Sequence, residues 1–202
     1  LEMPTAGKLN DGELGFSSSS IGAIVQNTLS FQAFPNIYGA LRYTGIGDKP
    51  EQYYFSSGYT YWDRSFDLHY MVSEQRKGLP SIAIGVRDFI GTGLYSGEYL
   101  VATKSLGDKL EISAGIGWGR FAGKNSFDNI FGKSTRVYSD MGVGGTFHVG
   151  QFFSGRNSPF VSLDYRLNEK IQLISELSSD NYTHETFSSK GFTRRTDLNL
   201  GL

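Results

Sequence analysis

The sequence predicts an all-β fold, an antiparallel up-and-down transmembrane β-barrel, and three observations point to it. Apolar and polar residues alternate with a period of two through most of the chain. Several alternating runs reach the ~9–11 residues that a tilted strand needs to cross a bilayer, whereas strands of soluble sandwiches are nearer ~5–6 residues. Short and long connections alternate between the runs, which is typical of a barrel with short turns at one rim and long loops at the other.

Composition supports strands and excludes several classes of function. The chain has 26 glycines and 14% aromatic residues, which favour strands and turns over helices. Its formal charge of -1 lacks the basic excess of a nucleic-acid-binding protein. The absence of cysteine rules out disulfides, thiol catalysis and zinc–thiolate sites. A mean hydropathy of -0.28 remains compatible with a membrane barrel, because polar lumen positions offset the lipid-facing ones.

We expect about eleven strands, and we interpret the chain as a partial barrel or a fragment of one with about 10–12 strands. They are separated by short turns such as Pro35-Asn36 and Asn168-Glu169 and by long loops such as 47–64 and 122–136. The expected strands are 13–19, 24–34, 37–46, 65–75, 80–90, 98–106, 109–121, 137–149, 159–167, 170–179 and 194–202.

The phase of the alternation divides the side chains between two faces of the sheet. Aliphatic residues share one phase, and we expect them to point outward and to be exposed: Ile82, Ile84, Val86, Ile112, Ile116, Leu163, Ile171 and Leu173. Charged residues and a histidine share the other phase or lie beside it, and we expect them to line a polar lumen: Arg42, Asp67, His69, Arg87, Glu111, Arg120, Asp164, Arg166 and Glu176. Opposite charges on neighbouring strands should pair, and Arg87 is the first candidate.

The same alternation also fits an inverted architecture. A soluble sandwich or a lipocalin-like barrel would bury the aliphatic set and expose the charges. The exposure of the aliphatic side chains therefore distinguishes the two architectures.

No motif carries recognisable catalytic, metal or cofactor chemistry, so we expect a protein that is not an enzyme. The run GTGLYSG at 91–97 lacks the spacing and the following helix of a phosphate-binding loop, and it is better explained as a reversal between strands. Asp88 and Glu98 flank this reversal and could act as an acid–base pair, although pairing with Arg87 or Lys104 is the simpler interpretation. The three histidines, His69, His148 and His184, show no metal-ligand spacing.

Glycines are frequent at expected inward positions and allow two interpretations. They could relieve crowding in a strongly curved wall, or they could leave a smooth inner surface beside a passing glycan. The glycines concerned are 115, 117, 119, 142, 144 and 145.

The segment LPSIAIGVRDFIGTGLYSGEYLVATK at 79–104 resembles the central signature of the YjbH family of bacterial outer-membrane proteins. Shorter segments resemble the family in the same order along the chain. They are MPTAGKLNDGEL (3–14), LRYTG (41–45), DRSFD (63–67), ISAGIGWGR (112–120), SPFVSLDYR (158–166) and LISELSSDNY (173–182).

The resemblance implies an outer-membrane barrel with a role in exopolysaccharide and group 4 capsule production. It implies membrane lipid, polysaccharide and other export proteins as partners, and no catalytic residues to carry over. The family's chains are much longer, so we expect residues 1–202 to be one barrel domain within a longer protein. Two other functions stay open: an outer-membrane barrel enzyme acting on lipid or glycan, and a soluble β-barrel that binds sugar or lipid.

Overall fold

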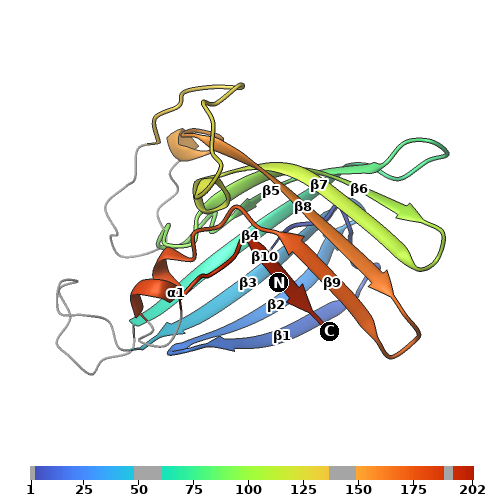
Figure 1. Ribbon diagram of the computed structural model, residues 1–202, viewed down its shortest axis with the longest axis horizontal. Helices are drawn as coiled ribbons and strands as arrows, with labels where there is room; N and C mark the ends of the chain where they lie inside the picture. The colour runs from blue at the N-terminus through green and yellow to red at the C-terminus, as the bar shows by residue number, and fades with distance from the viewer. Residues whose placement is uncertain (1–2, 48–60, 137–148, 189–192) are drawn as a thin grey trace.

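The strands form a single antiparallel sheet in which every strand pairs with its neighbours in sequence (Figure 1). The computed structural model describes residues 3–47, 61–136, 149–188 and 193–202. Ten strands are present in these ranges: β1 (Leu14–Ile21), β2 (Ile24–Phe34), β3 (Ile37–Ile46), β4 (Tyr61–Ser73), β5 (Ser81–Arg87), β6 (Gly97–Leu106), β7 (Leu110–Trp118), β8 (Asn157–Arg166), β9 (Gln172–Leu177) and β10 (Leu198–Gly201). The expected all-β antiparallel meander is confirmed.

The helices are short and lie in the connections between strands. Two 3-10 helices, η1 (Gly119–Ala122) and η2 (Val149–Gln151), lie between β7 and β8, and α1 (Thr183–Ser188) lies between β9 and β10. No helix in the described ranges has the length and apolar character needed to cross a membrane.

Two expected strand ends were wrong for local reasons. The strand expected at 80–90 ends at Arg87, because Asp88 adopts a φ of 53° that breaks the extended run. The strand expected at 109–121 ends at Trp118, because Gly119 has a φ of 59° and starts a 3-10 turn. The strand expected at 194–202 is reduced to β10, whereas 137–149 lies almost wholly outside the described residues.

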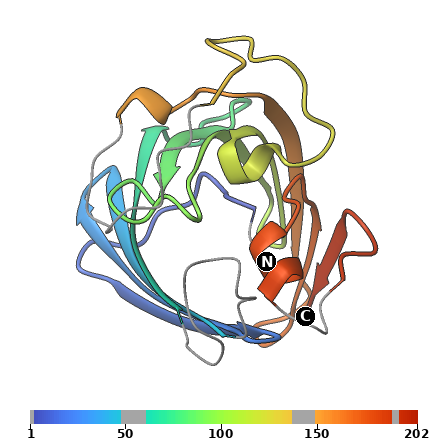
Figure 2. The ribbon, with the colours of Figure 1, turned by 90° about the vertical axis from the view of Figure 1, so that its left-hand side faces the viewer.

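The sheet curls around a central space without closing on itself (Figure 2). Within the described residues, β1 pairs only with β2 and β10 only with β9, so each leaves one free edge. The described residues therefore form a curled open sheet and not a closed barrel.

The outer surface of the curl is apolar and exposed. Leu163, Ile171 and Leu173 are 39%, 39% and 41% exposed, and the other five residues of the expected outward set are half-buried. On the opposite face of the same strands, Ala83 is 0% exposed and Ser162 is 7% exposed. This distribution has the phase predicted for a membrane barrel and is the reverse of that in a soluble sandwich.

Trp118 is the main exception to outward exposure. It has the outward phase at the end of β7, yet it is only 2% exposed. The long segment between β7 and β8 folds back over it, and the Phe131 and Phe153 rings lie 6.0 and 5.3 Å from its ring. The same segment covers Glu98, which forms an ion pair of 2.7 Å with Arg136.

Two inward glycines are covered by aromatic rings. A Cβ on Gly115 would lie 2.3 Å from the Phe160 ring, and a Cβ on Gly117 would lie 2.2 Å from Phe121. Glycine occupies these positions because aromatic rings pack directly over them. This supports the interpretation that the glycines relieve crowding, and not the one in which they leave a smooth surface for a glycan. Glycines 142, 144 and 145 lie outside the described residues.

Gly115→Ala is therefore expected to destabilise the fold by about 1–3 kcal/mol, the usual cost of overpacking. Its Cβ would also meet the Leu100 carbonyl oxygen at 2.6 Å, and that backbone cannot move away cheaply. Gly15→Ala on β1 is the matched control, because its nearest neighbour would be 3.8 Å away. Thermal unfolding in detergent, followed by circular dichroism, measures both. Equal stability of the two variants would contradict the packing described here.

Candidate functional site on the inner face

The strand registers place the expected lumen charges on one face of the sheet. Glu111 pairs in register with Asp164, and Ser162 pairs with Glu176, so these strands share one inward phase. The same phase continues through β6 and β5 to Arg87 and through β4 and β3 to the remaining charges. The set that shares this face is Arg42, Asp67, His69, Arg87, Glu111, Asp164, Arg166 and Glu176. Their role in lining a lumen stays a prediction.

Oppositely charged groups do pair across neighbouring strands on this face. The Arg42 guanidinium lies 2.5 Å from the Asp67 carboxylate, and the two side chains are 10% and 11% exposed. The Arg87 guanidinium lies 4.9 Å from the centroid of the Phe121 ring. The Arg42–Asp67 pair joins β3 to β4 and neutralises these two charges locally.

An aromatic group adjoins these charges. The Tyr38 ring stacks on the His69 ring with centroids 4.5 Å apart. The Tyr99 hydroxyl and the His69 Nδ1 share a hydrogen bond of 2.8 Å. The expected lumen histidine is therefore only 1% exposed and belongs to a packed cluster that links β3, β4 and β6.

Residues 3–8 run across the inner face instead of lying outside the sheet (Figure 2). The Met3 amide donates to the Glu176 carboxylate at 3.0 Å, and the Ala6 amide donates to the Thr103 hydroxyl at 2.7 Å. Met3 and Ala6 pack into the main apolar cluster with Ala83, Tyr99, Val101, Phe121 and Phe160. This segment therefore fills the side of the central space next to β5, β6, β8 and β9.

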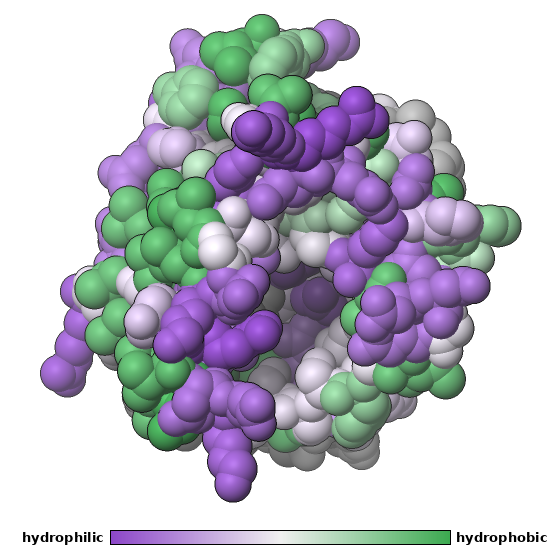
Figure 3. Space-filling model, turned by 90° about the vertical axis from the view of Figure 1, so that its right-hand side faces the viewer, coloured by the Kyte–Doolittle hydropathy of each residue, from purple (hydrophilic) through white to green (hydrophobic). Residues whose placement is uncertain are grey.

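The opposite side of the central space keeps a hydrophilic lining. Figure 3, which views the end with the short turns, shows a hollow bordered by hydrophilic residues. Lys8 lies at this rim, 2.5 Å from the Glu74 carboxylate. The inward positions of β1 and β2 carry hydroxyl and amide groups, namely Ser17, Ser19, Gln26, Thr28 and Ser30.

The turn after β5 brings three carboxylates together at the other rim. The Asp88 amide donates to the Asp67 carboxylate at 2.9 Å, and the Tyr95 amide donates to the Asp88 carboxylate at 3.0 Å. Thr92 binds Asp63 through its hydroxyl. Burial, reinforced by the neighbouring Asp63 carboxylate, raises the pKa of the Asp88 carboxyl to about 7. Asp88 therefore changes charge close to neutral pH.

Arg120 lies in η1 and not on a strand. Its guanidinium contacts Asp180 at 2.6 Å and Glu185 at 2.7 Å, and it stacks 4.8 Å from the Tyr95 ring. The cluster ties η1 to α1 and to the turn after β5, so Arg120 organises the rim with the long loops. Its expected place in the barrel wall was wrong, because the strand ends two residues earlier.

In the described part of the chain, the serine and histidine on the inner face of β4 do not form a catalytic pair. Ser65 and His69 share the inner face of β4 but are four residues apart, which is about 13 Å along a strand and beyond hydrogen-bond reach. The suggested acid–base pair is also divided, because Glu98 binds Arg136 on the outer side, whereas Asp88 binds Tyr95 at the inner rim. No group of three His, Asp or Glu side chains in the described ranges could hold a metal ion. The absence of enzymatic activity stays a prediction.

Sequence reasoning missed two features of this site. The inward course of residues 3–8 has no periodic signal in the sequence. Arg136 lies in a long loop, 38 positions from its partner Glu98, so nothing in the local sequence reveals the pair.

The raised pKa of Asp88 predicts how stability depends on pH. The folded state binds this proton more tightly than the unfolded state does, whose carboxyl has the ordinary pKa of 3.8. Its contribution to stability is therefore largest below that value and declines as pH rises towards about 7. Asp88→Asn is expected to remove this decline, because Asn is neutral and also tolerates positive φ.

Chemical unfolding in detergent at about pH 4 and about pH 8 measures this linkage. Asp108→Asn, an exposed carboxylate in the turn between β6 and β7, is the matched control and should leave the pH dependence unchanged. If the free energy of unfolding declined with pH equally in Asp88→Asn and in the unsubstituted protein, the pH dependence would not arise from Asp88.

Known proteins match the whole of this chain. The YjbH family, described as exopolysaccharide biosynthesis protein YbjH, matches residues 1–202. A relative from Escherichia coli (strain K12), named uncharacterized lipoprotein YjbH, is 30% identical over 210 residues, which cover 100% of this chain and 29% of the relative. No solved structure matches the chain. The full-length family match shows that the chain belongs to the YjbH family of exopolysaccharide biosynthesis proteins.

Proposed function

We propose that this chain forms the wall of an outer-membrane β-barrel that serves the secretion or assembly of exopolysaccharide, as a channel or scaffold without covalent chemistry. The observation that carries the proposal is the division of one curled sheet into an exposed apolar outer face and a charged inner face. The family's description supports the link to exopolysaccharide. The name of the Escherichia coli relative, a lipoprotein, supports a place in the cell envelope.

The outer face fits a bilayer better than water. Large apolar side chains are exposed along most of the curl, including Leu41 at 49%, Val72 at 53% and Leu177 at 53%. Such a continuous apolar surface is rare on soluble proteins. Aromatic residues lie near strand ends, with Tyr43 stacked on Trp62 at 4.9 Å. These rings suit the aromatic girdle at the membrane interface.

The free edges of β1 and β10 need partners under this proposal. An open sheet edge exposes unpaired amide and carbonyl groups, which the hydrocarbon core of a bilayer does not tolerate. We therefore include further strands, or pairing between the two edges, in the proposed membrane form. The relative is longer than this chain, which spans 29% of its length, so additional strands have a source.

The inner face offers groups that bind sugars reversibly. Hydroxyls and amides of β1 and β2, together with the Arg42 guanidinium, donate and accept hydrogen bonds, and the Tyr38 ring offers an aromatic face for a sugar ring. Tyr138, a tyrosine of the expected strand 137–149, lies outside the described residues. Selectivity in such a passage arises from charge, hydrogen bonding and width.

The two other functions are less well supported. An outer-membrane enzyme needs a nucleophile and base within hydrogen-bond reach, and the Ser65–His69 spacing does not provide them. A soluble sugar- or lipid-binding barrel would place the aliphatic face inside, opposite to the exposure observed.

Adjacent substitutions on opposite faces test the membrane proposal in the full-length protein. Leu163→Arg places a cation on the outer face and is expected to cost up to about 2–4 kcal/mol in the bilayer, and so to reduce the protein in the outer-membrane fraction. Asp164→Arg, the matched control on the inner face, should leave that amount nearly unchanged. Surface exopolysaccharide should fall when the gene is deleted and should be restored by the unsubstituted gene but not by Leu163→Arg. Equal outer-membrane levels of the two variants would contradict the membrane proposal, and unchanged exopolysaccharide after deletion would contradict the secretion role.

Removing residues 3–8 tests whether this segment narrows the passage. The deletion is expected to raise single-channel conductance in planar bilayers, because the segment fills the inner side next to β5, β6, β8 and β9. Lys8→Gln is the control, since it removes one exposed ion pair and leaves the segment in place. Conductance that is unchanged by the deletion, in protein that still inserts, would show that the segment does not obstruct the passage.

A further inference from the structure

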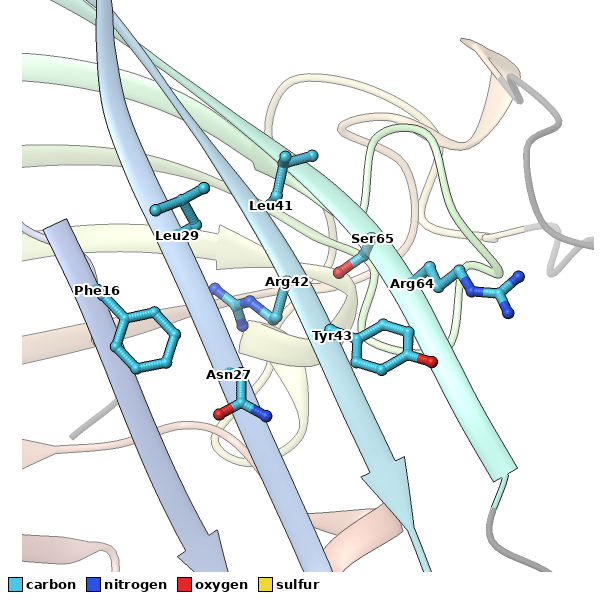
Figure 4. A pocket seen from close by; sticks show the side chains of 8 residues that line it. All are labelled: Phe16, Asn27, Leu29, Leu41, Arg42, Tyr43, Arg64 and Ser65. Carbon is cyan, nitrogen blue, oxygen red and sulfur yellow. The ribbon is translucent and has the colours of Figure 1, made fainter. Parts of the chain in front are cut away.

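A groove of about 370 Å³ lies on the outer face of β1 to β4 (Figure 4). Its walls include Phe16, Leu29 and Leu41, which are 72%, 40% and 49% exposed. Asn27, Tyr43 and Arg64 also line it, together with Arg42 and Ser65, which have the inward phase. Its volume lies within the ~300–1,000 Å³ range of small-molecule sites.

The strand registers arrange the groove in two rows. Asn27 pairs with Tyr43 and Tyr43 pairs with Arg64, so an amide, a phenol and a guanidinium form one line across β2, β3 and β4. A second line lies two residues further along the strands, away from the rim with the long loops. In this line Phe16 pairs with Leu29, and Leu29 pairs with Leu41. Polar groups therefore lie nearer that rim, and apolar groups lie deeper. An amphipathic lipid has the same order from headgroup to acyl chain.

Arg64 specifies the charge of the occupant. Its guanidinium is exposed on the outer face, 6.0 Å from the Tyr43 ring centroid. No Asp or Glu lies among the residues that line the groove. An outward Arg costs ~2–4 kcal/mol at the bilayer midplane and ~0–1 kcal/mol near the interface, so Arg64 belongs at the level of the lipid headgroups. A phosphate is the anion of that layer, and a guanidinium binds it with paired hydrogen bonds.

We propose that this groove binds one anionic phospholipid, with an acyl chain along Phe16, Leu29 and Leu41 and its phosphate on Arg64. The inference rests on the proposed membrane function. It adds a lipid site on the outside of the sheet that is separate from the glycan face. Asn27 and Tyr43 complete the headgroup site as hydrogen-bond donors beside the phosphate.

Native mass spectrometry of the full-length protein tests the site, with phosphatidylglycerol and phosphatidylcholine offered at equal concentration in detergent. We expect phosphatidylglycerol to be retained in preference. Arg64→Gln should weaken its retention about fivefold, the effect of one cation at an anionic lipid surface. Arg76→Gln is the matched control, because Arg76 is an exposed arginine in the turn between β4 and β5 at the opposite rim. It should retain phosphatidylglycerol as the unsubstituted protein does.

Leu41→Trp tests the acyl part separately, because it fills the groove and should lower the retention of both lipids. Unchanged phosphatidylglycerol retention in Arg64→Gln overturns the site. A multi-chain phosphorylated glycolipid is offered in a parallel measurement. If it is retained more strongly than phosphatidylglycerol, the phospholipid proposal is overturned and that glycolipid is the occupant. Protease protection in phosphatidylglycerol vesicles separates this inference from the proposed function. If the protein inserts but Arg64→Gln has no effect on lipid retention, the lipid site in the groove is overturned alone. If the protein does not insert, the lipid site and the proposed membrane function are both overturned.

Discussion

The rest of this structure depends on the strict alternation of side chains along paired strands. A one-residue slip in any register would turn the aliphatic set of that strand inward and its charges outward. Nine consecutive antiparallel pairings keep the phase from β1 to β10, and the two irregularities, in the β2–β3 and β4–β5 pairs, lie towards strand ends. Because the phase is kept, the outer face stays mostly apolar, and the inner face gathers Arg42, Asp67, Glu111 and Glu176 around one space. Both the proposed membrane wall and the proposed glycan surface follow from this one constraint.

The inner face is organised unevenly, and this unevenness matters for function. Next to β5, β6, β8 and β9, aromatic rings over Gly85, Gly115 and Gly117 and the segment 3–8 fill the space. Next to β1 and β2, serine, threonine and glutamine side chains face the hollow seen from the rim with the short turns (Figure 3). The long-loop rim is held by charge, through Arg120 with Asp180 and Glu185 and through the turn that contains Asp88. A glycan that contacts this protein from inside would therefore meet the β1–β4 side first.

Local sequence was sufficient for the strands and their phase, because period-two alternation is a property of neighbouring residues. It predicted β2 and β3 at their observed bounds and the common face of the charges from Arg42 to Glu176. It failed where distant residues decide the outcome. Trp118 has the outward phase but is covered by a loop whose Phe131 and Phe153 no local pattern brings there. Met3 and Ala6 lie in the central space, where their backbone amides donate hydrogen bonds to Glu176 and Thr103, more than ninety residues away. Positive φ at Asp88 and Gly119 shortened two strands that alternation alone would have extended.

The central claim is that one face of the sheet meets lipid and the other meets water. The chain has no cysteine, so single cysteines introduced at Ile84 and Leu163 on the outer face and at Thr28 and Asp164 on the inner face would be the only thiols in this part of the protein. Labelling in intact outer membranes, with a water-soluble thiol reagent and with a lipid-soluble one, measures the environment of each position. The account predicts that the water-soluble reagent modifies Thr28→Cys and Asp164→Cys, and that only the lipid-soluble reagent modifies Ile84→Cys and Leu163→Cys. Rapid modification of all four by the water-soluble reagent would contradict the account, because the apolar face would then lie in water.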